Sequence, residues 1–201
     1  MVSGIFFYWT SWIIWVLITF FMKKTKKRLF FACWILLSIS FSRFYITLES
    51  YSISVAFLII LGGSIILLIK LPNLMYHLIS SYTITIGYAA ILMWEKNAPV
   101  WMILPRHIQI PLILTLTIIL LEKSLYGRLS ICLLGVCGGE MIYSLTLFGY
   151  GFQESIGEMH FFDSLFFIIV ILAILDILHN GKNKLFLFME NYKGLVRWRN
   201  E

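Results

Sequence analysis

The residues of this 201-residue chain that could carry chemistry are a few ionisable side chains within long apolar runs. Glu140 lies near the middle of LSICLLGVCGGEMIYSLTLFGYG, and Arg43 lies within CWILLSISFSRFYITLESY. A charged side chain at the centre of a bilayer costs at least ~2.5 kcal/mol, so each of these residues needs compensation. Their charges are opposite and their expected depths agree within the reach of an arginine side chain. We therefore predict that Arg43 and Glu140 form an intramembrane polar centre.

Each member of this pair also has a simpler interpretation. Arg43 could extend outward toward the lipid headgroups, as long basic side chains near helix ends do. Glu140 could be a protonated carboxyl group that is hydrogen-bonded to a neighbouring helix. A second candidate pair is His77 and Asp176. His77 lies about one turn after the start of its apolar run and Asp176 about one turn before the end of its own, and both ends are expected on the cytoplasmic side, so the two residues share a depth. The alternative for these two residues is a position at the headgroup boundary.

Small residues mark two expected helix contacts. Gly135 and Gly139 form a GxxxG pair directly before Glu140, and this pattern lets a neighbouring helix approach closely. Gly62 and Gly63 lie at the centre of another apolar run and predict a second close crossing.

No motif in the sequence specifies a reaction. There is no HExxH pair for a metalloprotease and no GxSG nucleophile for a rhomboid-type protease, and the segment 161–178 has no lysine for a retinal Schiff base. The three cysteines, Cys33, Cys132 and Cys137, lie in apolar runs, where they are expected to be small core residues and not a disulfide or a zinc site. We predict no catalytic residue, no metal and no cofactor, and therefore a protein that is not an enzyme.

The composition indicates the environment in which these residues lie. The chain is 60% hydrophobic and 13% charged, with a mean hydropathy of +0.89, whereas soluble domains carry about 25% charged residues. This composition excludes a soluble protein and indicates one that lies in a lipid bilayer. The net charge of +6 does not indicate nucleic acid here, because the basic residues flank apolar runs.

The apolar runs predict an all-α polytopic membrane protein, a bundle of seven transmembrane helices in one domain covering residues 1–201. The expected spans are 5–21, 29–47, 53–69, 74–94, 100–121, 129–150 and 161–178. The fifth has an uninterrupted apolar core only between Ile108 and Leu121, so an interfacial or re-entrant segment is the alternative there.

Basic residues predict the orientation of the bundle. With seven spans and the N-terminus outside, thirteen of the sixteen lysines and arginines lie on the cytoplasmic side, as the positive-inside rule requires. Residues 179–201 then form a cytoplasmic tail that mixes apolar and aromatic residues with the basic residues Lys193, Arg197 and Arg199. Such a basic amphipathic segment is expected to bind anionic lipids of the inner leaflet.

The opening segment MVSGIFFYWTSWIIWVLITFFMKK, the seven-span layout over about 200 residues and the basic aromatic tail together resemble the YphA-like multi-pass membrane proteins of spore-forming Firmicutes. The resemblance implies a multi-pass protein of the bacterial inner (cell) membrane. It carries over no catalytic residue and no mechanism.

Two functions are consistent with these observations. The first is a non-enzymatic accessory or partner protein of the cell envelope or of sporulation, in contact with the lipid bilayer and with a membrane-protein partner but with no nucleic acid. The alternative is a small transporter or proton-coupled permease in which Glu140 is the titrating group. The surroundings of Glu140 separate them, because transport needs a carboxylate in a wet cavity and a structural role needs one in a dry helix contact.

Overall fold

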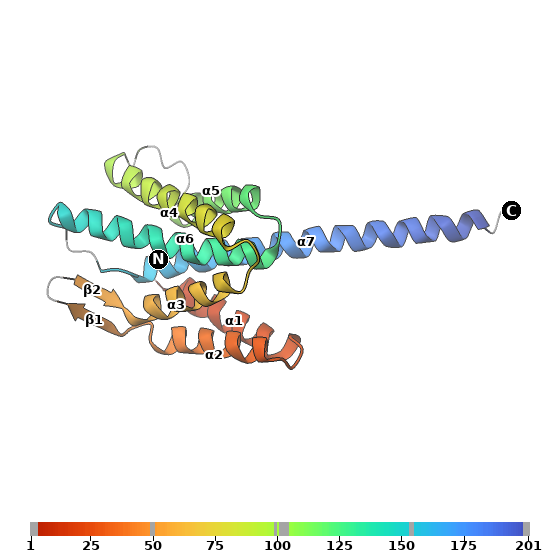
Figure 1. Cartoon of the computed structure of the whole chain (residues 1–201), viewed down its shortest axis with the longest axis horizontal. Helices are drawn as coiled ribbons and strands as arrows, with labels where there is room; N and C mark the ends of the chain where they lie inside the picture. The colour runs from red at the N-terminus through yellow and green to blue at the C-terminus, as the bar shows by residue number, and fades with distance from the viewer. Residues whose placement is uncertain (1–3, 49–50, 99, 101–104, 153–154, 199–201) are drawn as a thin grey trace.

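The computed structural model describes residues 4–48, 51–98, 100, 105–152 and 155–198 of the chain. Within them the chain forms seven helices and one pair of strands (Figure 1). In chain order these are α1 (Ile5–Phe21), α2 (Lys26–Ser40), β1 (Tyr45–Leu48), β2 (Tyr51–Ser54), α3 (Val55–Ile69), α4 (Leu74–Asn97), α5 (Arg106–Leu121), α6 (Leu125–Gly149) and α7 (Met159–Trp198). The prediction of a mostly helical chain is confirmed.

The boundary between the second and third helices differs from the sequence prediction. Residues 41–47 and 53–54 were expected to be helical, but α2 ends at Ser40 and β1 pairs with β2 in an antiparallel hairpin. The strands YITL and YSIS are rich in aromatic and β-branched residues, which fit a pleated surface better than a helix. The hairpin is extended by Ile156, which exchanges backbone hydrogen bonds with Ser52 and Ser54.

Local signals explain where several helices begin. The side chains of Thr25 and Ser124 cap α2 and α6 by accepting hydrogen bonds from the backbone N–H groups of Arg28 and Gly127. Pro105 directly precedes α5, where its missing N–H group costs nothing. The connections between consecutive helices are short, so the chain runs back and forth between the two ends of the bundle.

Helix α6 is the central element. It packs against α3, α4, α5 and α7, whereas α2 packs against α1 and α3. The core between these helices contains large apolar side chains that are almost fully buried, among them Phe7, Tyr88, Ile118, Phe162 and Leu165. In Figure 1 the hairpin lies at one end of the bundle, and α7 leaves the bundle at the other.

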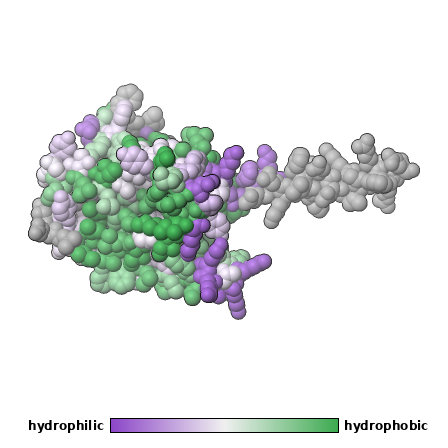
Figure 2. Space-filling model, viewed as in Figure 1, coloured by the Kyte–Doolittle hydropathy of each residue, from purple (hydrophilic) through white to green (hydrophobic). Residues whose placement is uncertain are grey.

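The surface is divided into an apolar belt and a basic end. Figure 2 shows hydrophobic side chains across the middle of the visible face and hydrophilic ones gathered at the end where α7 emerges. The connections α1–α2, α3–α4 and α5–α6 reach this end with exposed lysines at positions 23, 24, 70 and 123. Large side chains such as Phe20, Phe21 and Leu120 are more than 70% exposed, a distribution typical of a protein surrounded by lipid.

Two of the described helices are long and apolar enough to cross a membrane, namely α6 and the Met159–His179 part of α7. The apolar helices Ile5–Phe21, Val55–Ile69 and Ile108–Leu121 are shorter, with 10–17 residues. Helix α7 has 40 residues and continues without interruption beyond residue 178, where the tail was predicted to begin. At 1.5 Å per residue it is about 60 Å long, so its C-terminal part projects from the bundle (Figure 1).

Candidate functional site

Glu140 is buried at the contact between α6 and α4. Its side chain is 7% exposed, and its Oε2 atom accepts a hydrogen bond of 3.1 Å from the hydroxyl of Tyr88, which is 2% exposed. One turn earlier on α4, the hydroxyl of Thr85 donates to the backbone carbonyl of Gly135 at 3.1 Å. Polar groups of α4 thus bind α6 at two successive levels.

The glycines before Glu140 make this contact close. A Cβ atom on Gly135 would lie 2.6 Å from Cβ of Ile84, and one on Gly139 would lie 2.8 Å from the backbone oxygen of Thr85. A Cβ atom on Gly138 would meet the Thr85 hydroxyl at 2.8 Å. Because no side chain fits at these three positions, the backbones of α4 and α6 approach directly.

The predicted pair of Arg43 and Glu140 is not formed. Arg43 is exposed in the turn that follows α2, whereas Glu140 is buried at the contact between α4 and α6. Helix α2 packs mainly against α1 and α3. The neighbouring Ser42 hydroxyl shares a hydrogen bond of 2.7 Å with the hydroxyl of Tyr8. Arg43 was placed too deep because α2 was expected to continue to residue 47, whereas it ends at Ser40.

The two glycines of the other predicted pair, Gly62 and Gly63, have different surroundings. A Cβ atom on Gly63 would lie 2.0 Å from the indole ring of Trp34, so this glycine accommodates a helix contact between α3 and α2. Gly62 has no atom within 4 Å of such a position and faces open space. The Trp34 indole is held in place by a 2.8 Å hydrogen bond from its Nε1 atom to the backbone carbonyl of Ile59.

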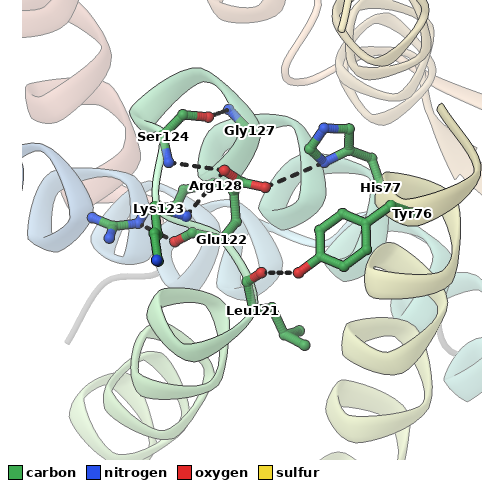
Figure 3. A network of polar contacts seen from close by, with 8 residues as sticks. All are labelled: Tyr76, His77, Leu121, Glu122, Lys123, Ser124, Gly127 and Arg128. Atoms are coloured by element: carbon green, nitrogen blue, oxygen red, sulfur yellow. Dashed lines mark hydrogen bonds and ion pairs between the residues drawn. The ribbon is translucent and has the colours of Figure 1, made fainter. Parts of the chain in front are cut away.

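His77 pairs with Glu122 and not with Asp176. Figure 3 shows the cluster at the basic end, where the Nδ1 atom of His77 lies 3.6 Å from Oε2 of Glu122. Oε1 of the same carboxylate accepts hydrogen bonds from the backbone N–H groups of Lys123 and Ser124, at 3.0 and 2.9 Å. Asp176 lies on α7 and is partly buried there.

This cluster fixes the connection between α5 and α6. The side chain of Arg128 donates to the backbone carbonyl of Glu122 at 2.7 Å, and the hydroxyl of Tyr76 donates to the carbonyl of Leu121 (Figure 3). Glu122 was missed in the sequence because a glutamate beside a lysine between two apolar runs is typical of a solvated loop. Its function here is to hold the first turn of α4 against the start of α6.

The pKa of Glu122 is lowered. Partial burial raises it, but the hydrogen bonds from Ser124 and Lys123 and the electrostatic interaction with His77 outweigh this effect, so that the pKa lies below its ordinary value of 4.5. A carboxyl group with a lowered pKa in the folded state stabilises the fold at neutral pH, and this contribution is lost as the pH falls through the lowered pKa.

Glu122→Gln is therefore expected to be less stable than the wild-type protein at neutral pH, with a difference that shrinks as the pH falls below 4.5. Thermal unfolding in detergent over a pH series measures this difference. A difference that persists unchanged through the acid range would contradict the assigned cause.

Asp163 is a buried carboxylate that the sequence analysis did not select. It is 8% exposed, and its two oxygens accept hydrogen bonds from the backbone N–H groups of Gly4 and Phe7, at 2.8 and 2.7 Å. These groups belong to the first turn of α1, which has no side-chain cap of its own. Asp163 therefore caps α1 from α7, and its negative charge lies at the positive end of the helix dipole.

A groove lies between α4 and α6 at the end of the bundle that carries the hairpin. It has a volume of about 760 Å³, and its lining includes Ala89, Ala90 and Met93 of α4 and Ile142 and Thr146 of α6. Glu140 is not among its lining residues. Among the described residues, no three histidine, cysteine or acidic side chains come together in a way that could hold a metal ion.

Comparison with known proteins assigns the family. The model of the YphA-like integral membrane proteins matches residues 3–196. The uncharacterized protein YphA of Bacillus subtilis (strain 168) is 29% identical over 143 residues, which cover 71% of each chain. No solved structure gives a significant match. The chain thus belongs to the YphA-like integral membrane protein family, as its opening segment and layout predicted.

Proposed function

We propose that this chain is a non-enzymatic accessory protein of the cell membrane that binds a membrane-protein partner. We further propose that it crosses the membrane seven times, with its N-terminus outside and its basic end in the cytoplasm. The division of the surface into an apolar belt and one strongly basic end supports this orientation.

The environment of Glu140 favours the accessory function over the permease. The carboxyl group is enclosed by Tyr88 and by the direct backbone contact of α4 with α6, and it lines neither the groove nor the other cavity described below. A group that loads and releases protons during transport needs a path to water. An enclosed carboxyl group that joins two helices is instead a structural contact, which favours the accessory function over the permease.

The groove between α4 and α6 is the proposed partner site. Ala90 and Thr146 are exposed within it, and Gly87 and Gly149 nearby have open space beside them. Small residues allow the backbone of another helix to approach closely, which is how transmembrane helices associate. We therefore propose that the groove accepts one transmembrane helix of the partner, with Lys96 and Asn97 at its rim.

Photocrosslinking in cells tests this function. A photoreactive amino acid at Ala90 is expected to give one protein adduct of defined mass, because this position lines the groove. The matched control is Leu116 of α5, which is 63% exposed and lies outside the groove. Glu140→Gln is expected to leave the adduct unchanged, because a glutamine oxygen still accepts the bond from Tyr88.

Three results would contradict the proposal. Identical products from Ala90 and Leu116 would mean that the groove selects no partner. An adduct of twice the chain mass would show that a second copy occupies it. Loss of the adduct in Glu140→Gln, in a protein that remains folded, would support the alternative in which Glu140 is the titrating group of a permease.

A further inference from the structure

A second cavity lies near the basic end, in the space that α2 leaves uncovered on α6. It has a volume of about 310 Å³, within the range of pockets that bind small molecules. Its walls come from α1, α2, α3, α6 and α7, because α2 packs mainly against α1 and α3 and less closely against α6. The apolar lining includes Ile18, Trp34, Ile35, Leu133, Phe166 and Ile169.

Hydrogen bonds hold two side chains in the wall of this cavity, Trp34 and Ser38. Trp34, which forms part of it, is held by its hydrogen bond to Ile59 and by the absence of a side chain at Gly63. The hydroxyl of Ser38 is also satisfied, since it donates to the backbone carbonyl of Trp34 at 2.9 Å. With its polar group engaged in this way, the lining offers an occupant mainly hydrocarbon surface.

The rim of the cavity is basic. Tyr126 of α6 lines the cavity, and the Nζ atom of Lys27 on α2 lies 6.0 Å from the centre of its ring. Met22 also lines the cavity and is followed in the chain by exposed Lys23 and Lys24. A hydrocarbon pocket with the ammonium group of Lys27 at its entrance, and with further lysines that follow a lining residue in the chain, matches a molecule with an apolar tail and an anionic head.

We propose that this cavity binds one acyl chain of an anionic phospholipid from the leaflet at the basic end, with the phosphate of the lipid at Lys27 and its neighbouring lysines. Charge complementarity at the rim selects the anionic headgroup, and the apolar lining selects the tail. The site differs from the predicted contact of residues 179–201 with anionic lipids, since the part of α7 in its described lining is at Phe166 and Ile169.

Native mass spectrometry of the full chain in mild detergent tests this site. The protein is titrated with phosphatidylglycerol or with phosphatidylcholine, and retention of one bound lipid is expected to be at least fivefold greater for phosphatidylglycerol. Glycerol 3-phosphate, which has the headgroup charge without a tail, is expected not to compete. Ile35→Trp fills the cavity and is expected to abolish retention, whereas Leu36→Trp, at an exposed position on the same helix, is expected to retain the lipid.

A second pair of variants tests the rim without altering the packing. Lys27→Gln is expected to lower retention of phosphatidylglycerol about fivefold, since one basic residue near an anionic surface contributes about 1 kcal/mol. Lys96→Gln removes an exposed charge at the other end of the bundle, away from the cavity, and is expected to have no effect. If Ile35→Trp does not fold, the two lysine substitutions are sufficient to test the proposal.

Equal retention by the two tryptophan variants, or equal effects of the two lysine substitutions, would overturn the proposal. Equal retention of phosphatidylglycerol and phosphatidylcholine by the wild-type protein would overturn it as well, because the basic rim would then select nothing.

Discussion

Asp163→Leu is expected to lower the free energy of unfolding by about 3 kcal/mol, because it leaves two backbone N–H groups of α1 without acceptors in a buried position. The same carboxylate joins the first helix of the chain to the last one. Its loss should therefore weaken the packing of α1 against α7 as well as the first turn of α1.

Thermal and denaturant unfolding in detergent measure this effect. The matched variant is Asp163→Asn, which keeps one oxygen for the N–H group of Phe7 but loses the negative charge and the second acceptor. We expect it to have about half the effect of leucine. If the leucine and asparagine variants are both as stable as the wild-type protein, the two hydrogen bonds do not hold α1 in place.

Gly135→Ala is the second substitution with a large expected effect. The new Cβ atom would lie 2.6 Å from Cβ of Ile84 and 2.9 Å from the backbone oxygen of Ser81, and neither neighbour is the free end of a flexible side chain. Helices α4 and α6 must therefore move apart, at a cost of about 2–3 kcal/mol. The displacement would also strain the hydrogen bond between Tyr88 and Glu140.

Gly87→Ala is the control for this prediction. Gly87 lies in the interior of α4 but has no atom within 4 Å of a new Cβ atom. Since alanine favours a helix over glycine by up to about 1 kcal/mol, this variant is expected to be slightly more stable than the wild-type protein. Opposite signs for the two substitutions support a direct α4–α6 contact, and equal effects would contradict it.

The sequence predicted the helices better than their ends and contacts. Apolar runs are long in a membrane protein, so α1 was predicted with the bounds that the structure shows. The same signal failed after Ser40, because the hairpin strands are as apolar as a helix and continue the run. That error moved Arg43 into the bundle and produced the predicted pair with Glu140.

Partners across the bundle were harder to predict than the residues themselves. Glu140 was selected because it interrupts an apolar run, and Gly135 and Gly139 because of their spacing. The residues that meet them, Tyr88 and Thr85, lie more than 45 positions away in the chain. Helices that are apolar on all sides carry little information in their periodicity about which face meets which neighbour.

Asp163 and Glu122 were missed for a related reason. Both stand at the edges of apolar runs, where acidic residues usually contact water. Their function depends on backbone N–H groups that become unsatisfied only when a helix begins nearby, 159 positions away in the case of Gly4. A sequence shows that such donors exist, but the packing of α1 beside α7 decides which carboxylate binds them.

Cysteine labelling in intact cells tests most directly the orientation on which the proposed function depends. In a chain with exposed Cys33 replaced by serine, Phe152→Cys is placed at the hairpin end, where Phe152 is 60% exposed, and Lys24→Cys is placed at the basic end. With the basic end in the cytoplasm, a membrane-impermeant thiol reagent should label the cysteine at position 152 in intact cells and the one at position 24 only after permeabilisation. Labelling of position 24 in intact cells, with position 152 protected, would contradict the account.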